Sequence, residues 1–405
     1  MRKAIYISLF VFTLASCSGN YEHPMELELQ RLDNALEHMS EYVALKESRI
    51  SVIEESLDSP DITLHQKYGI YGRLYEEYAP YQFDKAREML EMQENIADSM
   101  ADQSLKTTAL LNKAFLLTTS GLYHEADQTF SRLDTLSFDY QQKILWYNAR
   151  QKYLTDYQAY LKTSGIDLPE ASKISSYQNL LLENTPENSY LNRHISIMLL
   201  IWANRWEEAY DENMRLIETL NKSSRDYAVQ AYWQGFICEN LERKEENIRW
   251  WVESAICDIE GAIKDNASLC SIAIKLTDPR DTERAFKYIR LSLDDAIFYN
   301  AKLRMVQIAS TMPWIEKAYI DAKERQSRII GKYLMATVVA ALLLLAFAIA
   351  AVQLHIKGKK TARTIEKKNI LLAEPNKSIA MTEDVLRQTN LALIEANAAK
   401  EEYLG

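Results

Sequence analysis

The stretch GLYHEADQTF, residues 121–130, carries the pattern that decides the fold. It begins with a glycine, and Tyr123, Ala126 and Phe130 follow three and four residues apart. Residues at this spacing lie on one face of a helix. The small residue lets a second helix approach closely, and the aromatic residue one turn later fills the groove against the next helices. The stretch therefore predicts the second helix of a packed helix pair.

Related phrases recur along the chain. They are YQFDKAREML at 81–90, NRWEEAYDEN at 204–213, ERKEENIRWW at 242–251 and DPRDTERAFKYI at 278–289. The residues at the small position are Ala86, Ala126, Ala209, Asn247 and Ala285, and the copy with asparagine is the weakest. Their spacings are 40, 83, 38 and 38, where 83 is about two periods with one degenerate copy between. A fixed period of this size predicts a solenoid of helix pairs, and a helical bundle without repeats is the alternative.

The composition favours an all-α protein. The chain has 405 residues, with only 10 Gly and 8 Pro, so turns are scarce. The phrases resemble tetratricopeptide repeats, and Ala114 and Gly235 fall where that repeat has a small residue in its first helix. Because the period exceeds the usual length of about 34 residues, we expect a divergent form. Aromatic residues at helical spacing are expected to fill spaces between repeats, although an exposed row could stack on sugar rings.

Residues 1–17 read as a secretory leader. Arg2 and Lys3 precede an apolar core that is too short to span a bilayer. The sequence LASC, ending at Cys17, resembles the bacterial lipoprotein box, which predicts that this cysteine is acylated after cleavage. The alternative is an ordinary signal peptide that ends in small residues. Either reading predicts export of the N-terminal region.

Residues 333–354, YLMATVVAALLLLAFAIAAVQL, form an uncharged apolar stretch. As a helix it would cover about 33 Å, enough for a hydrocarbon core of about 30 Å. The flank that follows is richer in Lys and Arg than the flank that precedes it. This bias and the exported N-terminus predict a single-pass inner-membrane protein. Residues 25–332 would form a periplasmic helical-repeat domain, and residues 355–405 would form a cytoplasmic coiled-coil segment.

The tail carries a heptad pattern. Its apolar positions are Leu372, Ile379, Leu386 and Leu393, and asparagines stand at Asn369, Asn376, Asn390 and Asn397. Leucine at d with asparagine at a favours a parallel two-stranded coil, because paired asparagines set the register at a cost in stability. A weak coil of this kind suits an element that shifts between two packings, and a solvated single helix is the alternative. Pro375 predicts either that the coil begins after it or that the helix kinks there.

The sequence lacks the motifs that would indicate an enzyme or a cofactor-binding protein. The histidines are scattered, and HExxH, GxSxG and Gly-rich phosphate-loop motifs are absent from it. No Cys/His spacing suggests a metal site. Cys238, Cys257 and Cys270 are expected to be buried, and a disulfide between two of them stays open. The net charge of −10 argues against direct nucleic-acid contact. We therefore expect a non-enzymatic protein without cofactors.

Several phrases resemble a Bacteroidota family of membrane-bound regulators related to the regulator of starch utilisation. They include SAICDIEGAIKDNASL at 254–269, DTERAFKYIRLSLDDAIFYNAKLRM at 281–305 and LIEANAAKEEYLG at 393–405. The resemblance implies a leader, divergent tetratricopeptide-type repeats, one span, a coiled segment and a cytoplasmic domain of uncharacterised fold. In the family the last phrase continues into that domain, so we expect the chain to stop before an effector.

The leading hypothesis is a transmembrane signal-transduction protein. Its periplasmic repeats would sense a protein, peptide or carbohydrate ligand, and a parallel homodimer would relay the signal to the tail. The second hypothesis is a scaffold whose repeats assemble an envelope complex and whose span serves only as an anchor. A third is a sensor kinase cut short, although no phosphoacceptor histidine follows His355.

Overall fold

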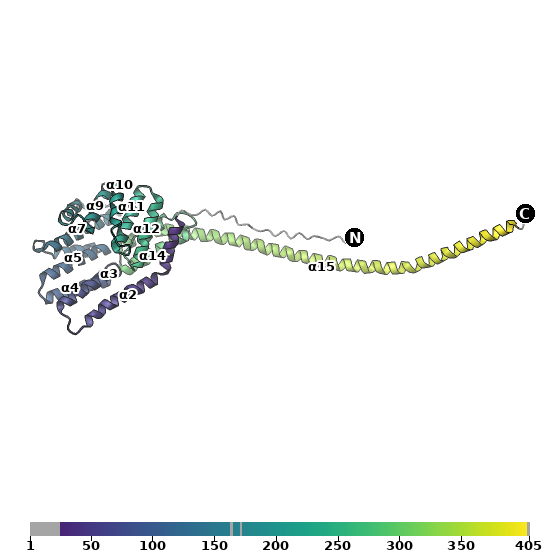
Figure 1. The fold of residues 1–405 in the computed structure, drawn as a ribbon, viewed down its shortest axis with the longest axis horizontal. Coiled ribbons are helices and arrows are strands. Elements are labelled where there is room, and N and C mark those ends of the chain that lie inside the picture. The colour runs from purple at the N-terminus through teal and green to yellow at the C-terminus, as the bar shows by residue number, and fades with distance from the viewer. Residues whose placement is uncertain (1–24, 163–164, 171, 403–405) are drawn as a thin grey trace. The chain divides into compact units, whose positions relative to one another are not determined.

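The structure, a computed structural model, describes residues 25–162, 165–170 and 172–402 (Figure 1). These residues form fifteen α-helices and two short 3-10 helices, with no strand among them, so the all-α prediction is confirmed. The α-helices are α1 (Glu26–Glu37), α2 (Met39–Glu55), α3 (Leu64–Tyr78), α4 (Phe83–Ser99), α5 (Gln103–Ser120), α6 (Tyr123–Ser131), α7 (Tyr140–Lys162), α8 (Lys173–Asn184), α9 (Tyr190–Trp202), α10 (Trp206–Ile217), α11 (Arg225–Asn240), α12 (Lys244–Glu260), α13 (Ser268–Lys275), α14 (Thr282–Tyr299) and α15 (Lys302–Glu402).

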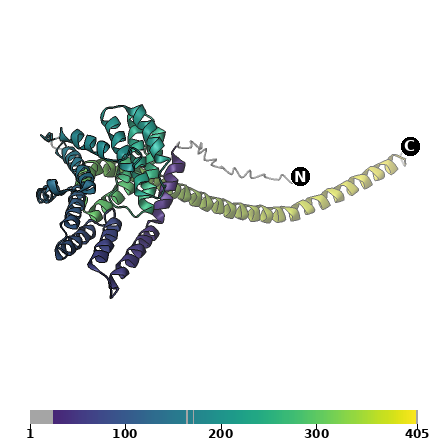
Figure 2. The ribbon, with the colours of Figure 1, turned by 60° about the vertical axis from the view of Figure 1, so that its left-hand side comes forward.

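The helices from α3 to α14 form six consecutive pairs, each packed across a turn (Figures 1 and 2). The pair α7/α8 occupies the interval between Ala126 and Ala209, where the sequence showed one degenerate copy. A solenoid of helix pairs is therefore the architecture of this region. The described residues up to Ala322 form one compact unit, which we call the repeat unit, and those from Lys323 form a second.

Three of the turns inside the pairs share one backbone conformation. Gly121, Asn204 and Glu242 have positive φ values of 81°, 56° and 58°. Gly121 directly follows the first helix of its pair, whereas Asn204 and Glu242 each lie one residue further along. The N–H two residues past the helix in the first of these turns, that of Leu122, donates to the carbonyl of Leu117 at 2.9 Å. This is the helix-ending motif that needs a left-handed residue. Three of the five copies of the phrase therefore follow turns of the same geometry.

The five small-position residues occupy one equivalent site in the second helix of their pairs. Each donates its backbone N–H to the N-cap carbonyl of its helix, at 2.8–3.0 Å. Their side chains are at most 4% exposed. They are Ala86 on α4, Ala126 on α6, Ala209 on α10, Asn247 on α12 and Ala285 on α14. A larger side chain here would hold the two helices of the pair apart.

The copy with asparagine packs differently from the others. Asn247 donates through Nδ2 to the carbonyl of Gly235 at 2.8 Å, so its buried amide has a partner. Trp251 lies directly on Gly235 and donates through Nε1 to the carbonyl of Tyr232 at 3.1 Å. A Cβ built on Gly235 would stand 2.4 Å from Cδ1 of the indole ring. Glycine is therefore required where α11 and α12 cross.

The variant Gly235→Ala is expected to lower the free energy of unfolding by about 2 kcal/mol, because the buried indole must move to admit a methyl group. The measurement is a urea titration of the full chain in detergent, followed by tryptophan fluorescence. Gly69→Ala is the matched control, since Gly69 lies inside α3 and no atom of another helix lies within 4 Å of the position that a Cβ would take. That change should stabilise by about 0.5–1 kcal/mol. Equal effects of the two variants would contradict the account of the α11/α12 crossing.

The first helix, α1, contacts the last helix of the six pairs, α14. Arg284 on α14 donates to both carboxylate oxygens of Glu26 on α1 at 2.7 Å, and to Asp33 at 2.9 Å. Tyr288 donates to the same Asp33 at 3.0 Å. These carboxylates raise the pKa of the Arg284 guanidinium. An ordinary solenoid makes contacts only between neighbouring repeats. This one closes on itself.

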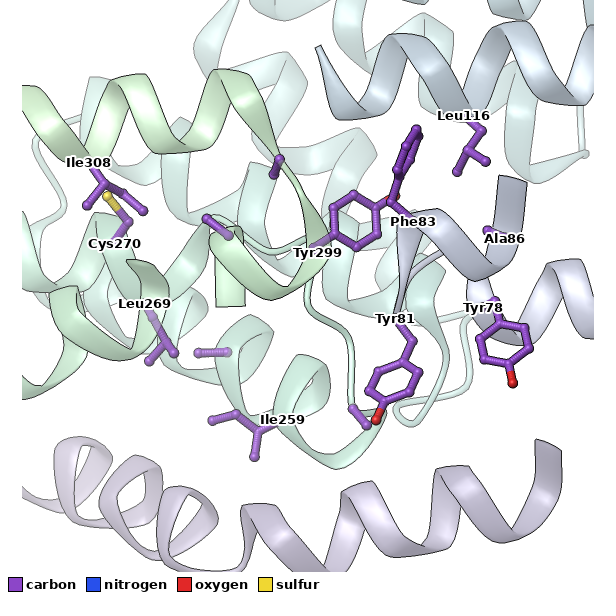
Figure 3. Close-up of a cluster of buried hydrophobic side chains, with 14 of the residues drawn as sticks. Tyr78, Tyr81, Phe83, Ala86, Leu116, Ile259, Leu269, Cys270, Tyr299 and Ile308 are labelled. Carbon is purple, nitrogen blue, oxygen red and sulfur yellow. The ribbon is translucent and has the colours of Figure 1, made fainter. Parts of the chain in front are cut away.

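One large core joins both ends of the repeat unit. It includes Leu29 and Leu32 of α1 together with Tyr288 and Tyr299 of α14. Figure 3 shows Tyr299 beside Phe83 of α4, with Ile308 of α15 next to Cys270 of α13. A second cluster is built by α9, α10 and α11. The burial of apolar side chains that lie far apart in the sequence therefore stabilises the closed arrangement of the helices.

Candidate functional site

Within the described residues, α15 is the one helix long and apolar enough to cross a membrane. Its most apolar window has a mean hydropathy of 2.7, and none of that window is buried within the protein. Bulky side chains such as Leu344 and Phe347 are 70% and 75% exposed. An unburied apolar surface of this size is typical of a segment that lies in lipid.

The tail part of α15 presents the predicted heptad positions without partners from the same chain. Leu372, Ile379 and Leu393 are each 58% exposed, and Leu386 is 62% exposed. The asparagines of the pattern, Asn369, Asn376, Asn390 and Asn397, are also exposed. The helix continues through Pro375 without a break in its assignment. The heptad face is therefore available to a second helix along its described length.

Inside the repeat unit, three helices bring together a polar cluster around His194. Gln230 on α11 is fully buried, and its Nε2 lies 2.8 Å from Nδ1 of His194 and 2.9 Å from the hydroxyl of Tyr190. The rings of Tyr190 and His194 stack on α9 with their centroids 5.8 Å apart. Asn213 of α10 donates to the carbonyl of Gln230 and to Oε1 of Gln234. This cluster ties α9, α10 and α11 together through hydrogen bonds.

Burial lowers the pKa of His194 to about 4, and the nearby charge of Lys152 contributes in the same direction. An unfolded histidine titrates near 6.5. Between these values the unfolded chain binds a proton that the folded protein does not. The free energy of unfolding should therefore fall as the pH falls from about 6.5 to about 4, by up to about 3 kcal/mol from this residue.

The variant His194→Asn removes this titration and should flatten the dependence of the unfolding free energy on pH between 4 and 6.5. Urea titrations across that range measure it. His124→Gln is the control, because it replaces a histidine that is exposed on α6. A His194 variant with the wild-type slope would assign the pH dependence to other groups.

A shallow groove of about 530 Å³ lies among α8, α9 and α10. Its polar lining includes Glu187, Asn188, Arg193 and Ser196, and Ile197 contributes an apolar surface. Such a mixture of donors and acceptors can hydrogen-bond a polar ligand. Aromatic side chains are absent from the groove's lining. Most of the aromatic residues instead pack inside the repeat unit, where Tyr123, Tyr153 and Tyr157 form one contiguous set.

The three cysteines in the described region are free thiols in buried positions. Burial raises the pKa of Cys238 and of Cys257 to about 12, so neither thiol ionises readily. Groups of acidic, histidine or cysteine side chains able to hold a metal ion are absent from the described residues. Cys17 and the predicted leader lie outside those residues.

The sequence did not single out His194 or Gln230 as a pair. The residues are 36 positions apart, and the weak local signal was an aromatic residue, Tyr190, one helical turn before the histidine. Nor did it predict the contacts of Arg284 or Tyr299 with the first helices, because these join residues more than 200 positions apart. The heptad residues, by contrast, were visible from their spacing alone.

The family model described as the SusR N-terminal TPR domain matches residues 36–310 of the chain. The matched region covers more than half of the 405 residues and runs from α1 into the first turns of α15. No curated protein matches the chain.

Proposed function

The chain belongs to the family of SusR-like regulators that carry this TPR domain, and we propose that it is a single-pass inner-membrane signal transducer. Membership supports a regulator-type role in carbohydrate utilisation, and regulators of this type are generally non-enzymatic. The resemblance noted from the sequence is confirmed. In the proposal, the repeat unit senses a ligand in the periplasm and the tail of α15 carries the response into the cytoplasm.

The observation that carries this proposal is the continuity of α15. The helix begins at Lys302 inside the repeat unit, includes the apolar stretch 333–354 and ends at Glu402 after the heptads. A helix without an intervening loop can transmit a translation or rotation of one end to the other. The scaffold hypothesis needs only an anchor and gives no role to the heptad face.

A carbohydrate or a peptide is the proposed ligand. The groove beside α9 offers Arg193, Asn188 and Glu187 to such a ligand, and none of these side chains has a charged or hydrogen-bonded partner in the described structure. Hydroxyl and amide groups of a neutral polar ligand could satisfy them. The relay then requires two copies of the chain, whose tails form a parallel coil.

Cysteine labelling tests the orientation. Asp61→Cys, in the exposed segment before α3, should react with an impermeant maleimide on intact spheroplasts. Lys368→Cys, in the tail, should react only after permeabilisation. The native cysteines of the repeat unit are buried and should contribute little background. Labelling of Lys368→Cys on intact spheroplasts would contradict the proposed topology.

A further inference from the structure

The corner between α14 and α15, residues Tyr299–Leu303, is bonded to the turns of the first two full helix pairs. The hydroxyl of Tyr299 donates to the carbonyl of Ala79 at 2.8 Å, just past the end of α3. The hydroxyl of Ser120, at the end of α5, donates to the carbonyl of Asn300 at 2.8 Å. Both are bonds of side-chain hydroxyls to backbone carbonyls, across about 180 to 220 residues of sequence.

The corner also fits closely against Gly121. A Cβ built there would stand 3.1 Å from the backbone nitrogen of Leu303 and 3.3 Å from Cβ of Lys302. Gly121 has φ +81°, so glycine serves both the turn and the close approach. Tyr299 is fully buried, and its ring meets Phe83 edge-on at 6.4 Å. We call these contacts of Tyr299–Leu303 with Ala79–Phe83 and Ser120–Gly121 the closure contact.

The first part of α15 packs on the rest of the repeat unit along one side, where Met305, Met312 and Ile315 are partly buried against the core. Between Lys302 and Ala322, Ile308 is the one buried residue, and Trp314 is 75% exposed. Phe286 of α14 stacks on Tyr319 of α15 with ring centroids 4.3 Å apart. Among the contacts that hold the start of α15, the closure contact supplies those nearest its N-terminus.

We propose that the closure contact is the input element that couples the curvature of the repeat unit to α15. Small rotations between neighbouring helix pairs add up along a solenoid, so the separation of its two ends changes most. The closure contact joins those two ends at the residue where α15 begins. A ligand that bends the repeat unit therefore tightens or opens this contact and moves the first turns of α15. This inference rests on the proposed function for its downstream consequence, but the contact itself is testable alone.

Hydrogen exchange on the full chain in nanodiscs tests the contact. In Gly121→Ala, backbone amides of residues 302–312 should exchange at least tenfold faster than in the wild type. Gly165→Ala is the matched control, because Gly165 also has positive φ, at +71°, but no atom lies within 4 Å of its Cβ position. Gly165→Ala introduces the same kind of backbone strain as Gly121→Ala but makes no contact with α15. Equal exchange of 302–312 in the two variants would overturn the proposal.

A milder double variant distinguishes loss of the closure contact from general unfolding of the repeat unit. The double variant Ser120→Ala/Tyr299→Phe removes the two hydroxyls without adding atoms, and it should raise exchange of 302–312 several-fold with the exchange of α9–α11 unchanged. Unchanged exchange of 302–312 in this double variant would also overturn the proposal.

Cross-linking through Leu386→Cys in the same samples separates this inference from the proposed function. If wild-type tails cross-link, a several-fold change of yield in Gly121→Ala but not in Gly165→Ala supports the coupling, and an unchanged yield overturns it. If wild-type tails do not cross-link at all, the dimeric relay fails. In that case, the hydrogen exchange of residues 302–312 still tests whether the closure contact holds the start of α15.

Discussion

Replacement of Asp295 by alanine is expected to lower the free energy of unfolding by about 3–5 kcal/mol. Asp295 on α14 accepts from Nζ of Lys264 at 2.6 Å and from Nδ2 of Asn266 at 3.2 Å. The Lys264 and Asp295 side chains are only 11% and 14% exposed. Removing the carboxylate leaves an ammonium group in a poorly solvated place, which costs far more than the loss of a surface ion pair.

The loss of the Asp295 carboxylate should also disturb the contact between the two ends of the repeat unit, because Lys264 is hydrogen-bonded to a turn near the N-terminal end. Its backbone N–H donates to the carbonyl of Pro80, in the turn between α3 and α4, at 2.8 Å. The pair therefore lies beside the closure of the solenoid. Burial raises the pKa of Asp295, and the opposing effect of Lys264 only partly offsets this.

Urea titration of the full chain in detergent measures the loss. Glu88→Ala is the control, because Glu88 and Lys85 form a pair at 3.0 Å with side chains 46% and 48% exposed. That pair should be worth less than about 1 kcal/mol. The double variant Lys264→Met/Asp295→Leu should recover most of the stability, since neither charge remains. A loss below about 1 kcal/mol in Asp295→Ala would show that the pair is solvated and unimportant for closure.

The second large effect is expected in the tail. Leu386→Asp should abolish dimerisation of the tail, because the apolar d position of a two-stranded coil would then bring two carboxylates together. The coil has little stability to lose, since asparagine stands at four of its a positions. Sedimentation equilibrium of the full chain in density-matched detergent measures the oligomeric state.

Gln388→Asp adds the same charge two residues later, at the outward f position, and should leave the dimer intact. If both variants dimerise like the wild type, the tail does not hold the copies together. If both dissociate, the effect comes from charge on the tail as a whole. Only a difference between the two positions supports the heptad register.

The repeat architecture was predictable because it rests on local patterns. The positions of Ala126 and its four counterparts follow from short-range spacing, and all five make the same N-cap hydrogen bond. The asparagine copy looked weak in the sequence, yet Asn247 has its own partner in Gly235, one helix earlier. The pair α7/α8 was visible only as a gap in the period, because its second helix, α8, lacks the small-residue phrase.

The closed arrangement was not predictable from pattern. Contacts such as Arg284 with Glu26, or Tyr299 with Ala79, depend on how small rotations add up over the intervening helix pairs. Periodicity within a helix holds no information about that sum. Similarly, Pro375 left two readings open in the sequence, and the structure keeps α15 helical across it. A proline at that point removes one backbone hydrogen bond without ending the helix.

We infer that two copies of α15 run side by side in register and carry the response of the repeat unit. Disulfide scanning of single cysteines from residue 379 to residue 395, in native membranes, tests it most directly. Identical residues on two chains can join only where parallel helices face each other in register. We expect high cross-linking yields at positions 379, 386 and 393 and low yields at positions 381, 388 and 395. Equal yields at both sets, or none at the first set, would contradict it.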